Sequence, residues 1–170
     1  MTHQKVLVVY GTKYGSTAEI AAWIADVLNE HDFDADAIPA GTAPDPRDYA
    51  AVVLGAGLYA GRWHRDATRY ARRHRTALRD MPVWLFSSGP LDSSASVREI
   101  PPVPGVARIA TRLGARGHTT FGGCLGESAT GFIARRIVSS GHGGDFRDRK
   151  SIDAWAGDIA DELAAHAPPA

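Results

Sequence analysis

Cysteine is almost absent from this sequence of 170 residues, which contains only Cys124. A single cysteine cannot form an internal disulfide, and no cysteine–histidine cluster has the spacing of a zinc site. Long hydrophobic runs are also missing: the first apolar run ends at Tyr10 and is far too short for a signal sequence or a membrane span. We therefore expect a chain without a transmembrane segment, located in the reducing cytoplasm.

Excess charge of one sign is missing as well, because 19 lysines and arginines are balanced by 19 aspartates and glutamates. The chain as a whole has no general attraction to nucleic acid, and we expect no nucleic-acid partner. Hydrophobic residues make up 44% and charged residues 22%, which is typical of a globular protein. Since no repeat or linker is found, residues 1–170 are predicted to form one domain.

Apolar runs and helical periodicities alternate along the chain. The first run is continuous and rich in β-branched residues, which favours a strand buried on both faces of a parallel sheet. The predicted strands are Val6–Tyr10, Phe33–Ile38, Ala51–Leu54 (closed by Gly55–Gly57), Pro82–Phe86 and His118–Leu125. The predicted helices are Ser16–Asn29, Arg65–Leu78, Val106–Leu113, Phe132–Ser139 and Ile152–His166. This alternation predicts an α/β fold with a doubly wound parallel sheet.

The segment between the first strand and the first helix reads Tyr-Gly-Thr-Lys-Tyr-Gly-Ser-Thr. Amides at a helix N-terminus lack partners within the helix, and the helix dipole favours an anion there. Three hydroxyl groups add neutral donors, and a glycine permits close backbone approach. The predicted phosphate-binding residues are Thr12, Lys13, Tyr14, Gly15, Ser16 and Thr17.

Two other phosphate-binding motifs are excluded at this position. The segment lacks the Gly-x-Gly-x-x-Gly of dinucleotide-binding proteins and the Gly-Lys-Ser/Thr of nucleoside triphosphatases. A hydroxyl-rich loop without an essential basic residue suits a phosphate monoester. The alternative is an ordinary helix cap formed by Ser16 or Thr17.

Residues Val8–Thr17, with Ala21 four residues on, resemble the flavodoxin signature. The resemblance implies bound flavin mononucleotide (FMN) and a flavodoxin-like three-layer sandwich with a five-stranded parallel sheet of order 2-1-3-4-5. The residues alone do not distinguish FMN from a deazaflavin. A chain of this fold that binds no flavin and serves as a binding or regulatory module is the alternative from another functional class.

In such a sheet, ligands bind at the carboxyl ends of the strands, near the point where the strand order reverses. Two further loops are therefore predicted to contact the flavin ring. The first contains Gly57, Leu58 and Tyr59, and its tyrosine is placed to stack on the ring. The second contains Ser87, Ser88, Gly89 and Pro90, whose backbone amides are placed to bond the polar edge of the ring. We expect Trp63 to be a core anchor and Cys124 to be a small buried residue.

A narrower resemblance covers nearly the whole chain. The segments Leu54–Gly61, Ala77–Pro82 and Gly143–Asp148 resemble the flavodoxin-like, menaquinone-dependent protoporphyrinogen dehydrogenases of bacteria. That resemblance implies oxidation of a tetrapyrrole, a porphyrinogen, with a quinone or another redox partner as electron acceptor. The sequence departs from those enzymes at Gly126–Gly131, which is short, small and polar where they carry a long insertion rich in aromatic and basic residues.

The second predicted helix and its flanks are strongly basic. The stretch contains Arg62, Arg65, Arg69, Arg72, Arg73, Arg75 and Arg79, opposed only by Asp66. One interpretation is attraction to an anionic partner: substrate carboxylates, an acidic protein, or a lipid surface contacted peripherally. The other is a solvated arginine-rich face with no partner. No paired carboxylates or serine triad are found, so no catalytic acid or base is assigned.

Overall fold

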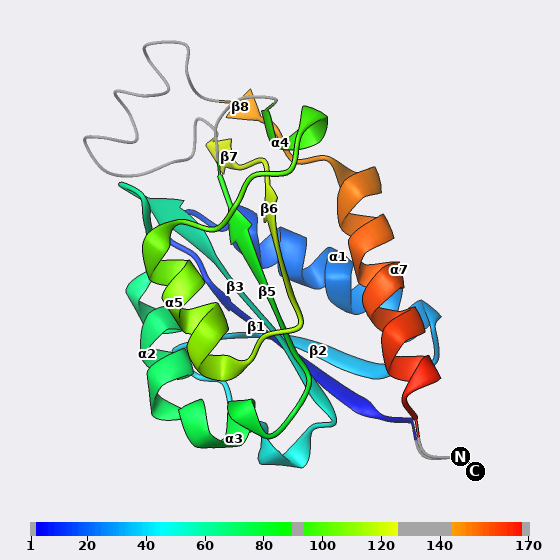
Figure 1. Cartoon of the computed structure of the whole chain (residues 1–170). Coiled ribbons are helices and arrows are strands. Elements are labelled where there is room, and N and C mark those ends of the chain that lie inside the picture. Colours follow the sequence, from blue (N-terminus) through cyan, green and yellow to red (C-terminus); the bar gives the residue numbers. More distant parts are fainter. Residues whose placement is uncertain (1–2, 90–93, 126–143, 168–170) are drawn as a thin grey trace.

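The computed structural model describes residues 3–89, 94–125 and 144–167. A twisted parallel sheet forms the centre, and helices cover both of its faces (Figure 1). The strands are β1 (Lys5–Gly11), β2 (Asp34–Pro39), β3 (Ala51–Tyr59), β4 (Arg62–Trp63), β5 (Val83–Ser88), β6 (Gly117–Phe121), β7 (Cys124–Leu125) and β8 (Gly144–Asp145). The helices are α1 (Ser16–Glu30), α2 (Arg65–Arg73), α3 (Arg75–Arg79), α4 (Ser94–Val97), α5 (Pro104–Leu113) and α7 (Arg149–Ala165), with a 3-10 turn at Pro46–Asp48.

The strand order in the main sheet is β2-β1-β3-β5-β6, and all of these neighbours are parallel. The short β4 pairs antiparallel with the end of β3 and lies outside this path. Counted along the parallel strands alone, the order is the predicted 2-1-3-4-5. The predicted α/β flavodoxin-like sheet is therefore confirmed.

Alternate residues of β1 supply the two hydrophobic cores. Val6 and Val8 pack in the cluster beneath α1 and α7, whereas Leu7 and Val9 pack in the cluster beneath α2, α3 and α5. All four side chains are fully buried. A strand covered on both faces needs apolar residues at every position, which explains the continuous run in the sequence.

The third strand is longer than predicted, because Gly55 and Gly57 lie inside β3 and do not close it. A Cβ atom at Gly55 would lie 2.2 Å from the ring of Phe86, so this glycine makes room for a neighbouring aromatic side chain. The chain turns later, at Ala60 and Gly61, both of which have positive φ. The glycine pattern was thus caused by close packing and not by a turn.

The predicted helix over residues 65–78 is two helices, α2 and α3, which meet at His74. The His74 ring packs against Tyr70, with 4.5 Å between the ring centroids. The predicted strand over 118–125 is likewise two strands, β6 and β7. Gly122 separates them, and a Cβ there would lie 2.0 Å from the Phe146 carbonyl oxygen, so the approach of a second segment ends the strand.

Other boundaries also shift. Two segments that lie between the predicted elements contain short elements of their own: residues 87–104 contain the end of β5 and the helix α4, and residues 144–150 contain β8. The last helix begins at Arg149, three residues earlier than predicted, because Asp148 caps it by accepting from the backbone amides of Lys150 and Ser151. The predicted helix Phe132–Ser139 and the segment Gly126–Gly131 lie outside the described residues. None of the helices in the described parts of the chain combines the length and apolar composition that a membrane span requires.

A chain of polar contacts joins β4, β5 and β6 inside the fold. Trp63 Nε1 donates to Ser87 Oγ at 2.8 Å, and His118 Nε2 lies 2.9 Å from the same oxygen. Because tryptophan is only a donor, the serine hydroxyl is free to donate to a neutral imidazole. Burial lowers the pKa of His118 from 6.5 to about 4. Trp63 is buried, as expected for a core anchor.

The neutral His118 makes the stability of the fold pH-dependent. Between pH 6.5 and about 4 the unfolded chain binds a proton that the folded chain excludes, so this contribution to stability is lost as the pH falls through that window. Allowing for partial solvent exposure, we expect a loss of about 1–2 kcal/mol. Urea unfolding of wild type and His118→Gln at pH 7 and pH 4 measures it. The wild type should lose more stability than the variant, and equal losses would contradict the assignment.

Candidate functional site

The loop between β1 and α1 holds the candidate site. Gly15 is the N-terminal capping residue of α1, has φ +92°, and provides no side chain to cap the helix. Its own amide donates to Thr12 Oγ1 at 2.9 Å. Neither Ser16 nor Thr17 caps the helix with its side chain, so the ordinary-cap interpretation does not describe this loop. The first amides of α1 therefore remain available to an anion.

Thr17 carries the most informative atom of the loop. Its side chain is fully buried, and Oγ1 has no hydrogen-bond partner among the residues that the structure describes. It is the single buried side-chain oxygen or nitrogen of that kind in the described parts of the chain. An unpartnered buried hydroxyl costs free energy unless a ligand or water bonds it. The loop thus fits a group that brings acceptor oxygens, as a phosphate does.

Tyr59 lies over the same loop. The Lys13 backbone amide donates to the Tyr59 hydroxyl at 2.7 Å. The Tyr59 ring meets the edges of Tyr14 and His64, with centroid distances of 6.1 and 5.9 Å. A Cβ at Gly57 would lie 2.7 Å from the Tyr59 hydroxyl, so the glycine allows the tyrosine to fold back across its own strand. The structure thereby brings together two of the predicted site segments, residues 12–17 and residues 57–59.

The remaining predicted segment, residues 87–90, begins at the end of β5, which lies on the side of β3 away from β1. The side chains of Ser87 and Ser88 are buried, and Ser87 Oγ is engaged by Trp63 and His118. Gly89 has φ +123° and its amide donates to the Phe121 carbonyl at 3.0 Å. Pro90 lies outside the described residues. The contact of this loop with a flavin ring stays a prediction.

Leu58 and His64 have structural roles near the site. Leu58 pairs with Trp63 across the β3–β4 hairpin. His64 caps the N-terminus of α2, because its Nδ1 accepts from the Asp66 backbone amide at 3.3 Å. Among the described residues, no group of three or more histidine, cysteine, aspartate or glutamate side chains is arranged to hold a metal ion.

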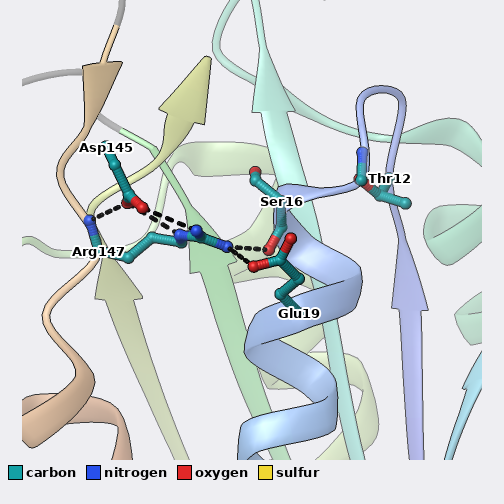
Figure 2. Close-up of polar contacts among 6 residues, drawn as sticks. Thr12, Ser16, Glu19, Asp145 and Arg147 are labelled. Carbon is teal, nitrogen blue, oxygen red and sulfur yellow. Dashed lines mark hydrogen bonds and ion pairs between the residues drawn. The ribbon is translucent and has the colours of Figure 1, made fainter. Parts of the chain in front are cut away.

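Arg147 is the residue near the site that sequence reasoning missed. Its guanidinium pairs with Asp145 at 2.7 Å and with Glu19 at 2.8 Å, and it donates to the Ser16 carbonyl at 3.4 Å (Figure 2). Its face also covers the Trp23 ring at 4.8 Å. These contacts fasten the segment after β8 to the first turn of α1. The hydrogen bond to Asp145 raises the pKa of Arg147, and the same bond lowers the pKa of Asp145.

Cys124 lies beside this cluster, in β7 opposite Asp145. Burial, followed by the charge of Asp145, raises the pKa of its thiol, which is therefore neutral at pH 7. A protonated thiol is a poor nucleophile. Cys124 is only partly buried, so the expectation of a small buried residue is wrong as to its burial.

Arg147 and its neighbour Arg149 form a matched pair for measuring what this connection contributes. Both guanidinium groups lie 4.8 Å from the Trp23 ring, but the Arg147 side chain is 9% exposed and that of Arg149, paired with Asp153, is 50% exposed. We expect Arg147→Ala to lower the free energy of unfolding by about 1–2 kcal/mol, because a largely buried guanidinium loses its contact with Trp23 and its bonds to two half-exposed carboxylates.

Arg149→Ala is the control and should cost less than about 1 kcal/mol. Urea unfolding of the two variants measures the difference. Equal losses in both would contradict a special role for Arg147.

Comparison with known proteins agrees with this geometry. A family model described as a flavodoxin domain matches residues 7–140. The protoporphyrinogen IX dehydrogenase (quinone) of Escherichia coli strain K12 is 32% identical over 85 residues, which are 49% of this chain and 47% of that protein. The match thus spans about half the length of this relative. It supports the narrower resemblance over about half of this chain, where the sequence analysis had extended it to nearly all.

Solved structures show the same fold at low identity. A flavodoxin from the domain Archaea has a TM-score of 0.65 at 12% identity and covers 94% of this chain and 99% of that one. A flavodoxin variant from Pseudomonas aeruginosa has a TM-score of 0.64 at 14% identity, with the same coverage. The rubredoxin oxygen:oxidoreductase of Desulfovibrio gigas has a TM-score of 0.63 at 13% identity and covers 95% of this chain but 36% of that one. Because the family model matches more than half of the chain, this protein belongs to the flavodoxin-domain family.

Proposed function

We propose that this protein binds FMN through the loop of residues 12–17 and acts as a flavin-dependent oxidoreductase or electron-transfer protein. The observation that carries the proposal is the buried, unpartnered Thr17 hydroxyl at the start of a helix without a side-chain cap. When bound, the flavin supplies the oxidation and reduction chemistry. The residues of this chain would hold its phosphate and control what reaches the ring.

The phosphate would be held by neutral donors. The hydroxyls of Thr12, Ser16 and Thr17 and the first amides of α1 are the groups of this kind in the loop. The hydroxyl of Thr12 orders the loop, because it already accepts from the Gly15 amide. The ring would lie between Gly57–Tyr59, at the carboxyl end of β3, and Ser87–Gly89, at the carboxyl end of β5.

A finer proposal concerns the substrate. The relative from E. coli is named a protoporphyrinogen IX dehydrogenase that uses a quinone, and by analogy we propose a porphyrinogen as electron donor and a quinone as acceptor. Turnover of protoporphyrinogen by purified protein with a quinone tests this point separately. Failure there would leave the FMN proposal standing.

The contact between Tyr59 and the loop favours a second candidate, a binding module of this fold without flavin. In that case the Tyr59 hydroxyl would satisfy the Lys13 amide permanently. In the FMN proposal the Tyr59 hydroxyl accepts from the Lys13 amide only until FMN binds, and a phosphate oxygen then replaces it as the acceptor. The two candidates differ in whether the purified chain takes up FMN at all.

Replacement of Thr17 tests two expected effects of its hydroxyl, a gain in FMN affinity and a cost in stability when no flavin is bound. We expect Thr17→Val to weaken FMN binding by on the order of 10-fold, because a hydrogen bond to a charged group is lost. The same change should raise the stability of the flavin-free protein by about 1 kcal/mol, because an unpartnered buried hydroxyl is removed. Quenching of flavin fluorescence and urea unfolding measure the two effects.

The matched control is Thr111→Val, which removes an exposed hydroxyl on α5 that donates to the Ala107 carbonyl. It should leave FMN affinity unchanged. If Thr17→Val bound FMN as tightly as wild type, the phosphate would not contact this hydroxyl.

Replacement of Tyr59 tests the displacement. Tyr59→Phe keeps the ring and removes only the hydroxyl that competes for the Lys13 amide. We expect FMN affinity to rise about 3–10-fold and riboflavin affinity to stay within about twofold, because riboflavin has no phosphate to take the freed amide. A selective loss of FMN affinity would instead make the hydroxyl a phosphate ligand, contrary to the displacement.

A further inference from the structure

A groove of about 640 Å³ lies between α2 and α5 and carries five arginines. Arg65, Arg69 and Arg72 come from α2, Arg62 from β4 and Arg108 from α5. All five are exposed. No aspartate or glutamate lines the groove among the residues that the structure describes.

What sets these arginines apart is that they gather around one groove that no acid lines. Arg47, Arg116, Arg147 and Arg149 each form an ion pair with a carboxylate. The groove arginines form none with any residue in the described ranges, and the same holds for the scattered arginines Arg73, Arg75, Arg79, Arg98 and Arg112. The chain carries 19 acidic residues for its 19 basic ones, so the acids are available but are placed elsewhere.

The arrangement costs stability within the isolated chain. Arg65 and Arg69 are four residues apart on α2, and Arg69 and Arg72 are three apart, so like charges are neighbours on one helix face. The nearest acid in the sequence, Asp66, lies 3.9 Å from His64 and does not pair with them. An anionic partner would turn this repulsion into attraction.

The groove also offers apolar surface between its charged walls. Val103 and Ile109 line it and are partly exposed, and the buried Trp63 forms part of its base. From Arg65 to Arg72 the charges extend about 10 Å along α2, since a helix rises about 1.5 Å per residue. One carboxylate cannot meet charges spread this widely. The occupant must carry several separated acids with an apolar group between them.

We propose that this groove is a docking site for an acidic peptide segment of a partner protein, with glutamate or aspartate against the arginines and an apolar side chain against Val103 and Ile109. The exposed guanidinium groups suit a protein segment better than a small ligand, which is usually enclosed on most of its surface. Arg62 pairs with Tyr59 across the hairpin, so a docked partner would lie beside the loop predicted to contact the flavin. The docking itself does not depend on bound flavin.

The test uses a fluorescein-labelled peptide of alternating glutamate and leucine, titrated by fluorescence anisotropy against the full chain with and without FMN. We expect binding that weakens as salt rises and that falls at least about 10-fold in Arg65→Glu/Arg69→Glu. The matched control is Arg75→Glu/Arg79→Glu, which makes the same charge change on α3, outside the groove. It should weaken binding by no more than about twofold.

A third variant, Arg108→Glu, makes the charge change on α5, the opposite wall of the groove, and should also weaken binding. Ile109→Ser should weaken binding of this peptide but not of one in which serine replaces leucine. Circular dichroism and thermal unfolding show that each variant is folded. Equal losses in the groove and control pairs would overturn the proposal, as would tighter binding of phosphatidylglycerol vesicles or duplex DNA through the same arginines.

Discussion

The start of α1 leaves a buried hydroxyl and several backbone amides without enough acceptors from the protein itself. Thr17 Oγ1 is unpartnered in the described parts of the chain, and the helix has no side-chain cap. In a well-packed interior such groups are nearly always satisfied. One contact from outside the loop meets this need in part. The Lys13 amide donates to the Tyr59 hydroxyl, which acts as its acceptor.

The preceding strand and two distant parts of the chain hold this loop in place. β1 delivers it at the carboxyl edge of the sheet, and β3 brings Tyr59 over it. From the other side, Arg147 binds the Ser16 carbonyl and Glu19 while it pairs with Asp145. The carboxylates neutralise the arginine, so its role is to fasten the segment near β8 to the helix. The tyrosine contact rests on one hydrogen bond.

The sequence was sufficient for the sheet, because continuous β-branched runs have a local physical cause, and it placed the loop that joins β1 to α1. Phosphate binding by that loop stays a prediction. The sequence was not sufficient where a contact with a distant residue determines the end of a strand. Gly55 looked like the end of a strand but makes room for Phe86, and Gly122 interrupts a strand because Phe146 approaches it. Arg147 could not be identified from local pattern, since its partner Glu19 lies 128 residues away. Asp145, two residues before Arg147, was the only local indication that this arginine forms an ion pair.

The β3–β4 hairpin joins the arginine groove to the loop of residues 12–17, because Arg62 lines the groove and its hairpin partner Tyr59 contacts the loop. Under the two proposals, redox chemistry and partner docking would share an edge of the molecule. The central claim is that the loop recognises a phosphate monoester. Equilibrium titration of the flavin-free wild-type chain with FMN and with riboflavin tests it most directly. FMN binding at least about 100-fold tighter than riboflavin is the result predicted, since several hydrogen bonds to a charged group are at stake. Equal affinities, or no uptake of either, would contradict the account.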